Sequence, residues 1–182
     1  MRGRYVPPVR VVAGTARGRR LVGPPGTSTR PTADRVREAT FNALGSLGVV
    51  EGATMVDLFA GSGAMGIEAL SRGAASATFV DIDGRALDAV RANLDATGLA
   101  DRATVVRSDA ARWLDDQVGA ADLAVLDPPY ATTDDELVAL LGRLPATVAV
   151  LESDRTIDPP APWRVLRSRT YGASVVTLVR QP

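Results

Sequence analysis

The chain has 182 residues, of which 46% are hydrophobic, a size and composition that suit one α/β domain with a single core. It contains neither cysteine nor histidine, which excludes disulfides, thiolate zinc sites, cysteine nucleophiles and Ser-His triads. The formal net charge is zero, and we expect the chemistry to depend on carboxylates, backbone groups, hydroxyls or a cofactor, without a metal ion.

The first segment, residues 1–31, is predicted to be a basic arm. All 21 basic residues of the chain are arginines. The first 40 residues hold nine arginines against two acidic residues, a net charge of +7, whereas the remainder holds twelve against nineteen, a net charge of −7. This asymmetry favours an anionic partner such as a nucleic acid. A merely solvated face, or an arginine bias from a GC-rich coding sequence, is the alternative interpretation.

The arm shows no sign of a targeting segment. Met1 is followed by Arg2, Gly3 and Arg4, without the apolar stretch of a signal peptide. No window approaches the roughly 18 apolar residues that a membrane span needs. We therefore expect a soluble, cytoplasmic protein without a membrane partner.

Residues 9–24 place apolar runs on both sides of a centre rich in glycine, threonine and arginine, a pattern typical of a β-hairpin. Thr32, which follows a proline, is a suitable cap for a helix of about residues 33–47. The main domain is predicted to begin here and to comprise residues 32–182. The apolar face of its first helix is expected at Val36, Thr40, Ala43 and Leu47.

From residue 54 onwards, short apolar runs alternate with helical patterns. The expected strands are 54–59, 76–81, 103–108, 122–127 and 147–153, and the expected helices are about 63–73, 85–98, 109–119 and 134–144. Such alternation favours a mostly parallel sheet with helices on both faces. Residues 163–181 hold two further runs that meet at Tyr171 and Gly172 without a helix between them, which predicts a C-terminal antiparallel strand pair.

A glycine-rich loop links the first strand to its helix. Gly61, Gly63 and Gly66 form a G-x-G-x-x-G pattern, and Asp81 ends the next strand 20 residues after Gly61. The glycines let the backbone approach a ligand, and the acid can accept hydrogen bonds from both ribose hydroxyls. This pattern fits a dinucleotide site and an S-adenosylmethionine site about equally well.

Acidic residues at the strand ends favour the second interpretation. Asp57 would repel a pyrophosphate but suits the ammonium group of a methionine or the amide donors that line the site. Asp81 is placed for a ribose, Ile82 for one face of an adenine, and Asp109 for the adenine amino group. Because the carboxyl ends of parallel strands meet at one edge of a sheet, we expect these residues to converge there. The alternative is that the acids only cap the helices that follow.

The fourth strand ends in Asp127, Pro128, Pro129 and Tyr130. Prolines fix φ and remove backbone donors, so they end strand pairing and leave a stiff corner that carries an acid and an aromatic ring.

Together these motifs resemble class I S-adenosylmethionine-dependent methyltransferases and, more narrowly, the RsmD-like family, which methylates the exocyclic N2 of a guanine in small-subunit ribosomal RNA. The resemblance rests on residues 10–21, 29–44, 57–74, 127–130 and 169–178, and the segment 29–44 narrows it beyond amino methyltransferases in general. An all-arginine basic set and a short C-terminus depart from the family pattern without touching the site.

The resemblance implies a Rossmann-like fold with an N-terminal β-hairpin extension and a role for each motif. The Asp127 carboxylate and the Pro128 carbonyl would accept hydrogen bonds from the target amine, Pro129 would keep the corner rigid, and Tyr130 would stack on the base. The residues implied for cofactor binding are Asp57, Phe59, Ala60, Gly61, Gly63, Asp81, Ile82, Asp109 and Ala110. Those implied for substrate binding are Arg10, Arg17, Arg19, Arg20, Arg30, Thr32, Arg35 and Asn42.

The implied cofactor is S-adenosyl-L-methionine and the implied partner is ribosomal RNA, naked or within an assembling small ribosomal subunit, bound by a monomer. Alternatives remain open at this point. The same chemistry could act on adenine in DNA, on tRNA or on a protein glutamine, because the Asp-Pro-Pro-Tyr motif is shared among these classes. A NAD-dependent oxidoreductase would leave Asp57 and that motif unexplained, and a non-catalytic RNA-binding module is the remaining alternative.

Overall fold

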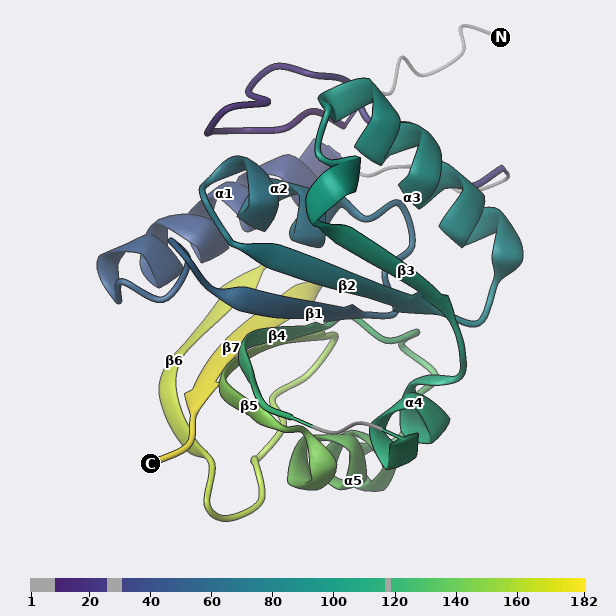
Figure 1. Ribbon diagram of the computed structural model, residues 1–182. Helices are drawn as coiled ribbons and strands as arrows, with labels where there is room; N and C mark the ends of the chain where they lie inside the picture. The colour runs from purple at the N-terminus through teal and green to yellow at the C-terminus, as the bar shows by residue number, and fades with distance from the viewer. Residues whose placement is uncertain (1–8, 26–30, 117–118) are drawn as a thin grey trace, which may run out of the picture.

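The computed structural model describes residues 9–25, 31–116 and 119–182, with the backbone alone for 31–33 (Figure 1). The helices are α1 (Pro31–Ser46), α2 (Ala64–Ser71), α3 (Gly84–Thr97), α4 (Ala110–Asp116) and α5 (Asp134–Arg143), with a short 3₁₀ turn at Ala100–Arg102. The strands are β1 (Thr54–Leu58), β2 (Ser76–Asp81), β3 (Ala103–Arg107), β4 (Ala121–Leu126), β5 (Ala146–Ser153), β6 (Arg164–Tyr171) and β7 (Ser174–Arg180).

The seven strands form one sheet in the order β3-β2-β1-β4-β5-β7-β6. Strands β1 to β5 are parallel, and β7 pairs antiparallel with both β5 and β6. This confirms the predicted mostly parallel sheet with an antiparallel C-terminal pair. The chain reverses direction through the sheet between β1 and β4, and ligands of open α/β sheets bind where such a reversal occurs, at the carboxyl ends of the strands.

Helices cover both faces of the sheet, as predicted. Figure 1 shows α1, α2 and α3 on one face and α4 and α5 on the other. The strand side chains divide accordingly: Phe79 and Leu123 lie in the core beneath the first group, and Val80 and Leu126 in the core beneath the second. Because successive residues of a strand point to opposite faces, these apolar runs supply both cores.

Helix α1 begins earlier than expected, and its predicted apolar face is confirmed in part. It starts at Pro31 and ends at Ser46, so Leu47 lies beyond it and is 40% exposed. Val36 and Thr40 are buried as predicted, and Ala43 is partly buried. Phe41 and Leu44, which the prediction did not include, are fully buried, so the buried face is wider than the sequence pattern predicts.

Residues 9–25 form a hairpin-like loop that packs on the domain. The Val11 amide donates to the Arg19 carbonyl at 3.0 Å, the Leu21 amide donates to the Val9 carbonyl at 2.8 Å, and a single antiparallel bridge joins Arg10 to Arg20. Val9, Val11 and Leu21 are buried in the same core as α1, α2 and α3. The loop therefore shares its core with the residues that follow, and the domain division at residue 31 stays a prediction. Within the described ranges, no helix is both long and apolar enough to span a bilayer.

Candidate active site

A cleft of about 740 Å³ opens at the carboxyl ends of β1, β2 and β4. The predicted residues that line it are Phe59, Asp81, Ile82, Asp127, Pro128, Pro129 and Tyr130. The other lining residues are Val36, Glu152, Tyr171, Gly172, Ala173 and Ser174. Among the described residues, the lining contains three carboxylates and no basic side chain, so this part of the cleft favours a cationic ligand over a pyrophosphate.

Asp81 ends β2 with both of its carboxylate oxygens held in place. One oxygen accepts from the Gly61 amide and the other from the Asp83 amide, each at 2.9 Å. A carboxylate has about four lone-pair sites, so each oxygen can accept a further hydrogen bond from a hydroxyl. The two backbone contacts thus fix a bidentate acceptor at the edge of the cleft.

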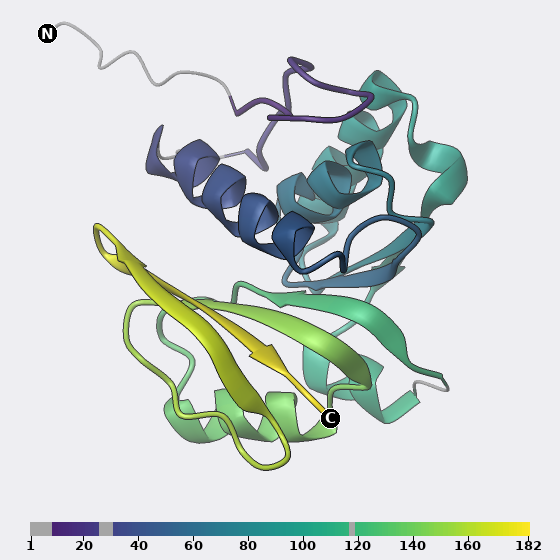
Figure 2. The ribbon, with the colours of Figure 1, turned by 90° about the vertical axis from the view of Figure 1, so that its left-hand side faces the viewer.

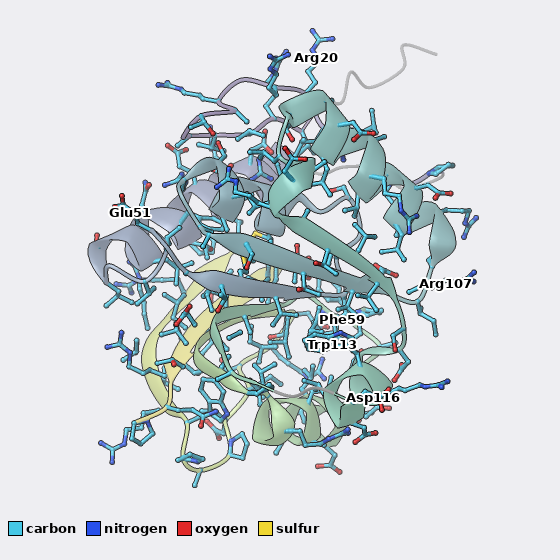
Figure 3. All side chains as sticks on the ribbon, in the orientation of Figure 1. Arg20, Glu51, Phe59, Arg107, Trp113 and Asp116 are labelled. Atoms are coloured by element: carbon cyan, nitrogen blue, oxygen red, sulfur yellow. The ribbon has the colours of Figure 1, made fainter. Side chains whose placement is uncertain are left out.

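Apolar side chains lie beside this acid. Ile82 is 66% exposed although it is a large hydrophobic residue. Phe59, which follows β1, has a φ of 64°, a left-handed conformation that costs a bulky residue roughly 1–3 kcal/mol and is most often found at functional sites. Figure 3 shows Phe59 next to Trp113, on the face of the sheet that α4 and α5 cover. An exposed isoleucine and a strained phenylalanine are the surfaces that a flat ring would contact.

Asp57 lies in β1, buried beneath the glycine loop and outside the cleft lining. Its side chain is 2% exposed, and its Oδ2 accepts from the Gly66 amide at 2.9 Å. Burial raises the pKa of this carboxyl to about 8, and the nearby carboxylates of Asp127 and Asp81 raise it further, whereas the hydrogen bond from Gly66 opposes the shift. At pH 7 the carboxyl is therefore mostly neutral, and its predicted role toward an ammonium group stays a prediction.

The loop glycines serve different physical needs. Gly61 and Gly63 have φ values of 55° and 75°, which side chains other than glycine adopt at a cost. A Cβ on Gly66 would lie 2.3 Å from Cε1 of Phe79, so this position needs a glycine because α2 crosses β2 closely. Ala60 is buried, and its amide donates to the Val80 carbonyl at 3.0 Å.

The Asp-Pro-Pro-Tyr corner is connected to the C-terminal hairpin. Asp127 and Pro129 are exposed and Pro128 is buried. The Tyr130 hydroxyl lies 2.9 Å from Oγ of Ser174, the first residue of β7. This contact joins the end of β4 to β7 across the cleft and orients the tyrosine ring.

Asp109 and Ala110 lie outside the main cleft. They line an adjacent cavity of about 280 Å³, and Phe59 borders both spaces. Oδ1 of Asp109 accepts from the Arg112 amide at 3.1 Å, at the start of α4. The structure therefore shows the helix-capping role for this acid, and its contact with an adenine stays a prediction.

None of the predicted substrate residues whose side chains the structure describes lines the main cleft. Arg10, Arg17, Arg19 and Arg20 are exposed on the N-terminal loop, and Figure 3 shows Arg20 pointing away from the molecule, far from Phe59.

The remaining substrate residues belong to α1 or precede it. Arg35 is exposed on this helix, and Thr32 is its second residue, with a side chain outside the described part. Arg30 also lies outside the described residues. Asn42 is exposed, accepts from Nη1 of Arg72 at 3.3 Å, and lines a separate cavity between α1 and β6.

The sequence prediction missed one wall of the cleft. Val36 was assigned to a core face, and Glu152 and the β6–β7 turn were not assigned to the site. The turn was visible in the sequence at Tyr171 and Gly172. The position of the turn in the cleft depends on the antiparallel pairing of β7 with β5. The local sequence pattern does not predict this pairing. In the described ranges, no three acidic side chains are grouped closely enough to hold a metal ion.

Comparison with known proteins places this arrangement in a family. The family model "Conserved hypothetical protein 95" matches residues 9–180. YlbH of Bacillus subtilis (strain 168) is 38% identical over 95% of this chain and 99% of its own length. Ribosomal RNA small subunit methyltransferase D of Escherichia coli (strain K12) is 39% identical over 80% of this chain and 68% of its own length.

Solved structures agree with the fold. The structure of yhhF from Escherichia coli superposes with a TM-score of 0.83 at 36% identity and covers 96% of this chain and 98% of its own. Magnesium protoporphyrin IX methyltransferase from Synechocystis, with 16% identity, shares the fold with a TM-score of 0.67 over 83% of this chain and 80% of its own. With the predicted motifs in place on this fold, the chain belongs to the Conserved hypothetical protein 95 family, which is also the family of ribosomal RNA small subunit methyltransferase D.

Proposed function

We propose that this protein transfers a methyl group from S-adenosylmethionine to the exocyclic N2 of a guanine in small-subunit ribosomal RNA. The observation that carries the proposal is the convergence, in one cleft, of a fixed nucleoside-type acceptor at Asp81 and the Asp-Pro-Pro-Tyr corner at residues 127–130. The substrate class follows from the family, whose Escherichia coli member is named for small-subunit ribosomal RNA.

The residues on the cofactor side fit S-adenosylmethionine. Asp81 presents two fixed oxygens to a pair of ribose hydroxyls, and the exposed Ile82 offers an apolar face to an adenine. The acidic lining suits a cofactor that carries a positive sulfonium. When bound, this cofactor supplies an activated methyl group, which explains how the chain manages without histidine or cysteine.

The residues of the Asp-Pro-Pro-Tyr corner make the exocyclic amine a better nucleophile. An exocyclic amine on a base is a poor nucleophile because its lone pair is delocalised into the ring. The Asp127 carboxylate and the Pro128 carbonyl accept hydrogen bonds from the amine protons and favour a more tetrahedral nitrogen. This role is one of positioning and electrostatic stabilisation, and prolines in the corner withhold amides that would compete for the same acceptors.

Tyr130 holds the base against this corner. Tyr130 is 38% exposed at the cleft, and its hydroxyl contacts Ser174, so its ring lies at the cleft beside the place where the base would enter. A base that is paired or stacked in RNA has to be extruded to reach the pocket. The exposed arginines of the N-terminal loop contact the phosphate backbone while the cleft holds the base.

The test uses small-subunit ribosomal RNA from a strain that lacks the gene, incubated with the purified protein and S-adenosylmethionine. We expect one methyl group per RNA, identified as N2-methylguanosine by nucleoside mass spectrometry. Asp127→Ala should lower turnover by about 10²–10³, the usual cost of removing one transition-state hydrogen-bonding group, with cofactor affinity within a few-fold of the parent.

Two further results decide the details. Tyr130→Ala should weaken the RNA complex by about 1–3 kcal/mol, the usual contribution of a base-stacking contact. A methyl group found on a ring nitrogen or carbon, or on DNA or protein with RNA unmodified, would contradict the proposal.

A further inference from the structure

The reaction cleft continues into a groove between α1 and β6. Tyr171 lines both the cleft and a narrow hollow of about 10 Å³ under α1. Arg167 and Ala43 line that hollow and also a wider cavity of about 490 Å³ further along the helix. Figure 2 shows α1 lying alongside the C-terminal hairpin, with its N-terminal end on the side of the β6–β7 turn. The three hollows thus follow one another in a path from the cleft along β6, and neighbouring hollows share lining residues.

The path is basic on its β6 side. Arg167, Arg169 and Tyr171 occupy alternate positions of β6 and pair in continuous register with β7, so they lie on the same face of the sheet. Two residues along a strand correspond to about 6.6 Å, and the two guanidinium groups therefore stand in a row that leads away from Tyr171. Both arginines are exposed.

The charges of this row are not neutralised within the described part of the chain. The side chains of Arg167 and Arg169 take part in none of the side-chain hydrogen bonds or ion pairs of the described residues. The described residues that line the two hollows under α1 include no aspartate or glutamate, whereas those of the reaction cleft include three acidic residues. The sign of the charge changes at Tyr171, where the path leaves the cleft.

We propose that this groove, formed by α1 and β6, binds the RNA strand on one side of the target nucleotide. The strand leaves the cleft past Tyr171, its phosphates contact Arg169 and Arg167, and it ends near Asn42 at the wide end of the groove. The inference rests on the proposed function, because it takes the substrate in the cleft to be a nucleotide of RNA. It adds a second RNA surface, distinct from the arginines of the N-terminal loop.

Continuity and chemistry favour single-stranded RNA as the occupant. A strand whose nucleotide is held in the cleft has to continue out of it, and this path offers no opposing carboxylate. Proteins that bind single strands combine a positive groove with aromatic stacking surfaces, and Tyr171 at the junction supplies such a surface next to the cationic row. An acidic protein segment could bind the same charges, but it would not be covalently continuous with the nucleotide in the cleft.

The test compares Arg167→Ala/Arg169→Ala with the parent protein in binding ribosomal RNA fragments at four or five salt concentrations. If both arginines contact phosphates, the slope of log affinity against log salt should flatten by up to about 1.4 units, at about 0.7 per phosphate for single strands. Cofactor affinity should stay unchanged. The matched control is Arg91→Ala/Arg112→Ala, which removes the same charge from exposed positions on α3 and α4 outside the cleft and groove.

Shortened RNA fragments locate the contact. Removing the nucleotides on one side of the target guanine should abolish the difference in RNA affinity between the parent and the β6 variant, whereas removing those on the other side should preserve it. The reason is that the shortened RNA and the protein variant would remove the same contact, and their effects on affinity would then not add. Parallel salt dependences of the parent and the β6 variant would overturn the inference, as would an equal flattening in the control variant. A defect seen only with assembled particles and absent with naked RNA would also overturn it and assign the surface to a protein.

These outcomes are separable from failure of the proposed function. If the parent protein methylates no RNA, the proposed function is wrong. If the parent methylates RNA and the β6 variant matches it in affinity and salt dependence, only the groove is wrong.

Discussion

Asp57 illustrates how one residue links the site to stability. Its pKa in the folded chain is raised from 3.8 to about 8, so between these values the folded protein holds a proton that the unfolded chain has released. Stability falls with rising pH wherever the folded state binds more protons. The cost of burying Asp57 is therefore absent below about pH 4, grows between about pH 4 and pH 8, and is constant above pH 8.

We expect Asp57→Asn to remove this cost. The amide oxygen can still accept from the Gly66 amide, and no proton is exchanged on folding. The free energy of unfolding from urea titrations should increase relative to the parent at pH 8 and change little at pH 4.5. A difference between the two proteins that does not depend on pH would contradict the assignment of the raised pKa to Asp57.

The loop glycines allow a second prediction. Gly66→Ala introduces a Cβ 2.3 Å from the ring of Phe79, which is fully buried and cannot move aside. Overpacking of this kind costs about 1–3 kcal/mol. Gly61→Ala places its Cβ in open space, with its nearest neighbour at 3.9 Å, but at a φ of 55° it costs about 1–2 kcal/mol of backbone strain.

The two glycine variants are distinguished by rescue, with thermal unfolding as the measurement. Phe79→Leu removes the ring atoms that the new Cβ would meet. The loss of melting temperature caused by Phe79→Leu should therefore be smaller in the Gly66→Ala background than in the parent. In the Gly61→Ala background this loss should equal that in the parent. Independent, additive effects of Gly66→Ala and Phe79→Leu would show that close contact between α2 and β2 is not what position 66 requires.

At the scale of elements, the N-terminal loop is held to α2 by a buried acid. Glu68 is fully buried, and its two oxygens accept from the Val12 and Ala13 amides at 2.8 and 3.0 Å. The same carboxylate pairs with Arg37 of α1 at 3.4 Å and with Arg72 at 2.7 Å. One side chain therefore joins the loop, α1 and α2.

We expect Glu68→Ala to lower the free energy of unfolding by about 3–5 kcal/mol, the usual cost of removing one member of a buried ion pair. Arg37, 3% exposed, would keep one ion pair, with Asp34 at 3.0 Å, and the Val12 and Ala13 amides would lose their acceptor. Glu68→Gln keeps one acceptor oxygen and should cost less. Asp88→Ala is the control, because it breaks an exposed pair with Arg91 and should cost less than about 1 kcal/mol. Equal losses for Glu68→Ala and Asp88→Ala would contradict the anchoring role.

Glu68 shows which features of the fold the sequence could predict and which it could not. The apolar runs of β1 to β5 are bounded by acids and glycines, so their positions and parallel arrangement follow from local pattern. Glu68 lies in a helical pattern where its charge predicts exposure, and its burial follows from a loop more than fifty residues earlier in the chain. Likewise the conformation of Phe59 and the approach of Ser174 to Tyr130 result from long-range pairing that local sequence does not encode.

At the scale of the whole molecule, the cofactor should stabilise the folded chain. A ligand that binds only the folded state at a hundredfold excess over its dissociation constant contributes about 2.7 kcal/mol. For a chain of this size, each kcal/mol raises the melting temperature by about 2–4 °C, so we expect a rise of about 5–10 °C with S-adenosylhomocysteine.

The controls for this thermal shift are NAD and Asp81→Ala. NAD should produce no shift, because the described residues of the cleft lining include three carboxylates and no cation for a pyrophosphate. Asp81→Ala should lose about 1.5–3 kcal/mol of cofactor affinity, the range for hydrogen bonds to a charged group, and should show a smaller shift at the same concentration. A shift with NAD, or an undiminished shift in the variant, would refute the cofactor assignment.

The residues that line the cleft lie far apart in the sequence, so they are synthesised at different times. Phe59 follows β1, and Asp81 and Ile82 lie at the end of β2, whereas Tyr171 and Ser174 belong to the β6–β7 hairpin. Chains are synthesised at about 5–20 residues per second, so the hairpin follows the cofactor side by roughly 5–20 seconds. The complete cleft can exist only once the hairpin has been made and β7 has paired with β5, so the site is completed late in synthesis.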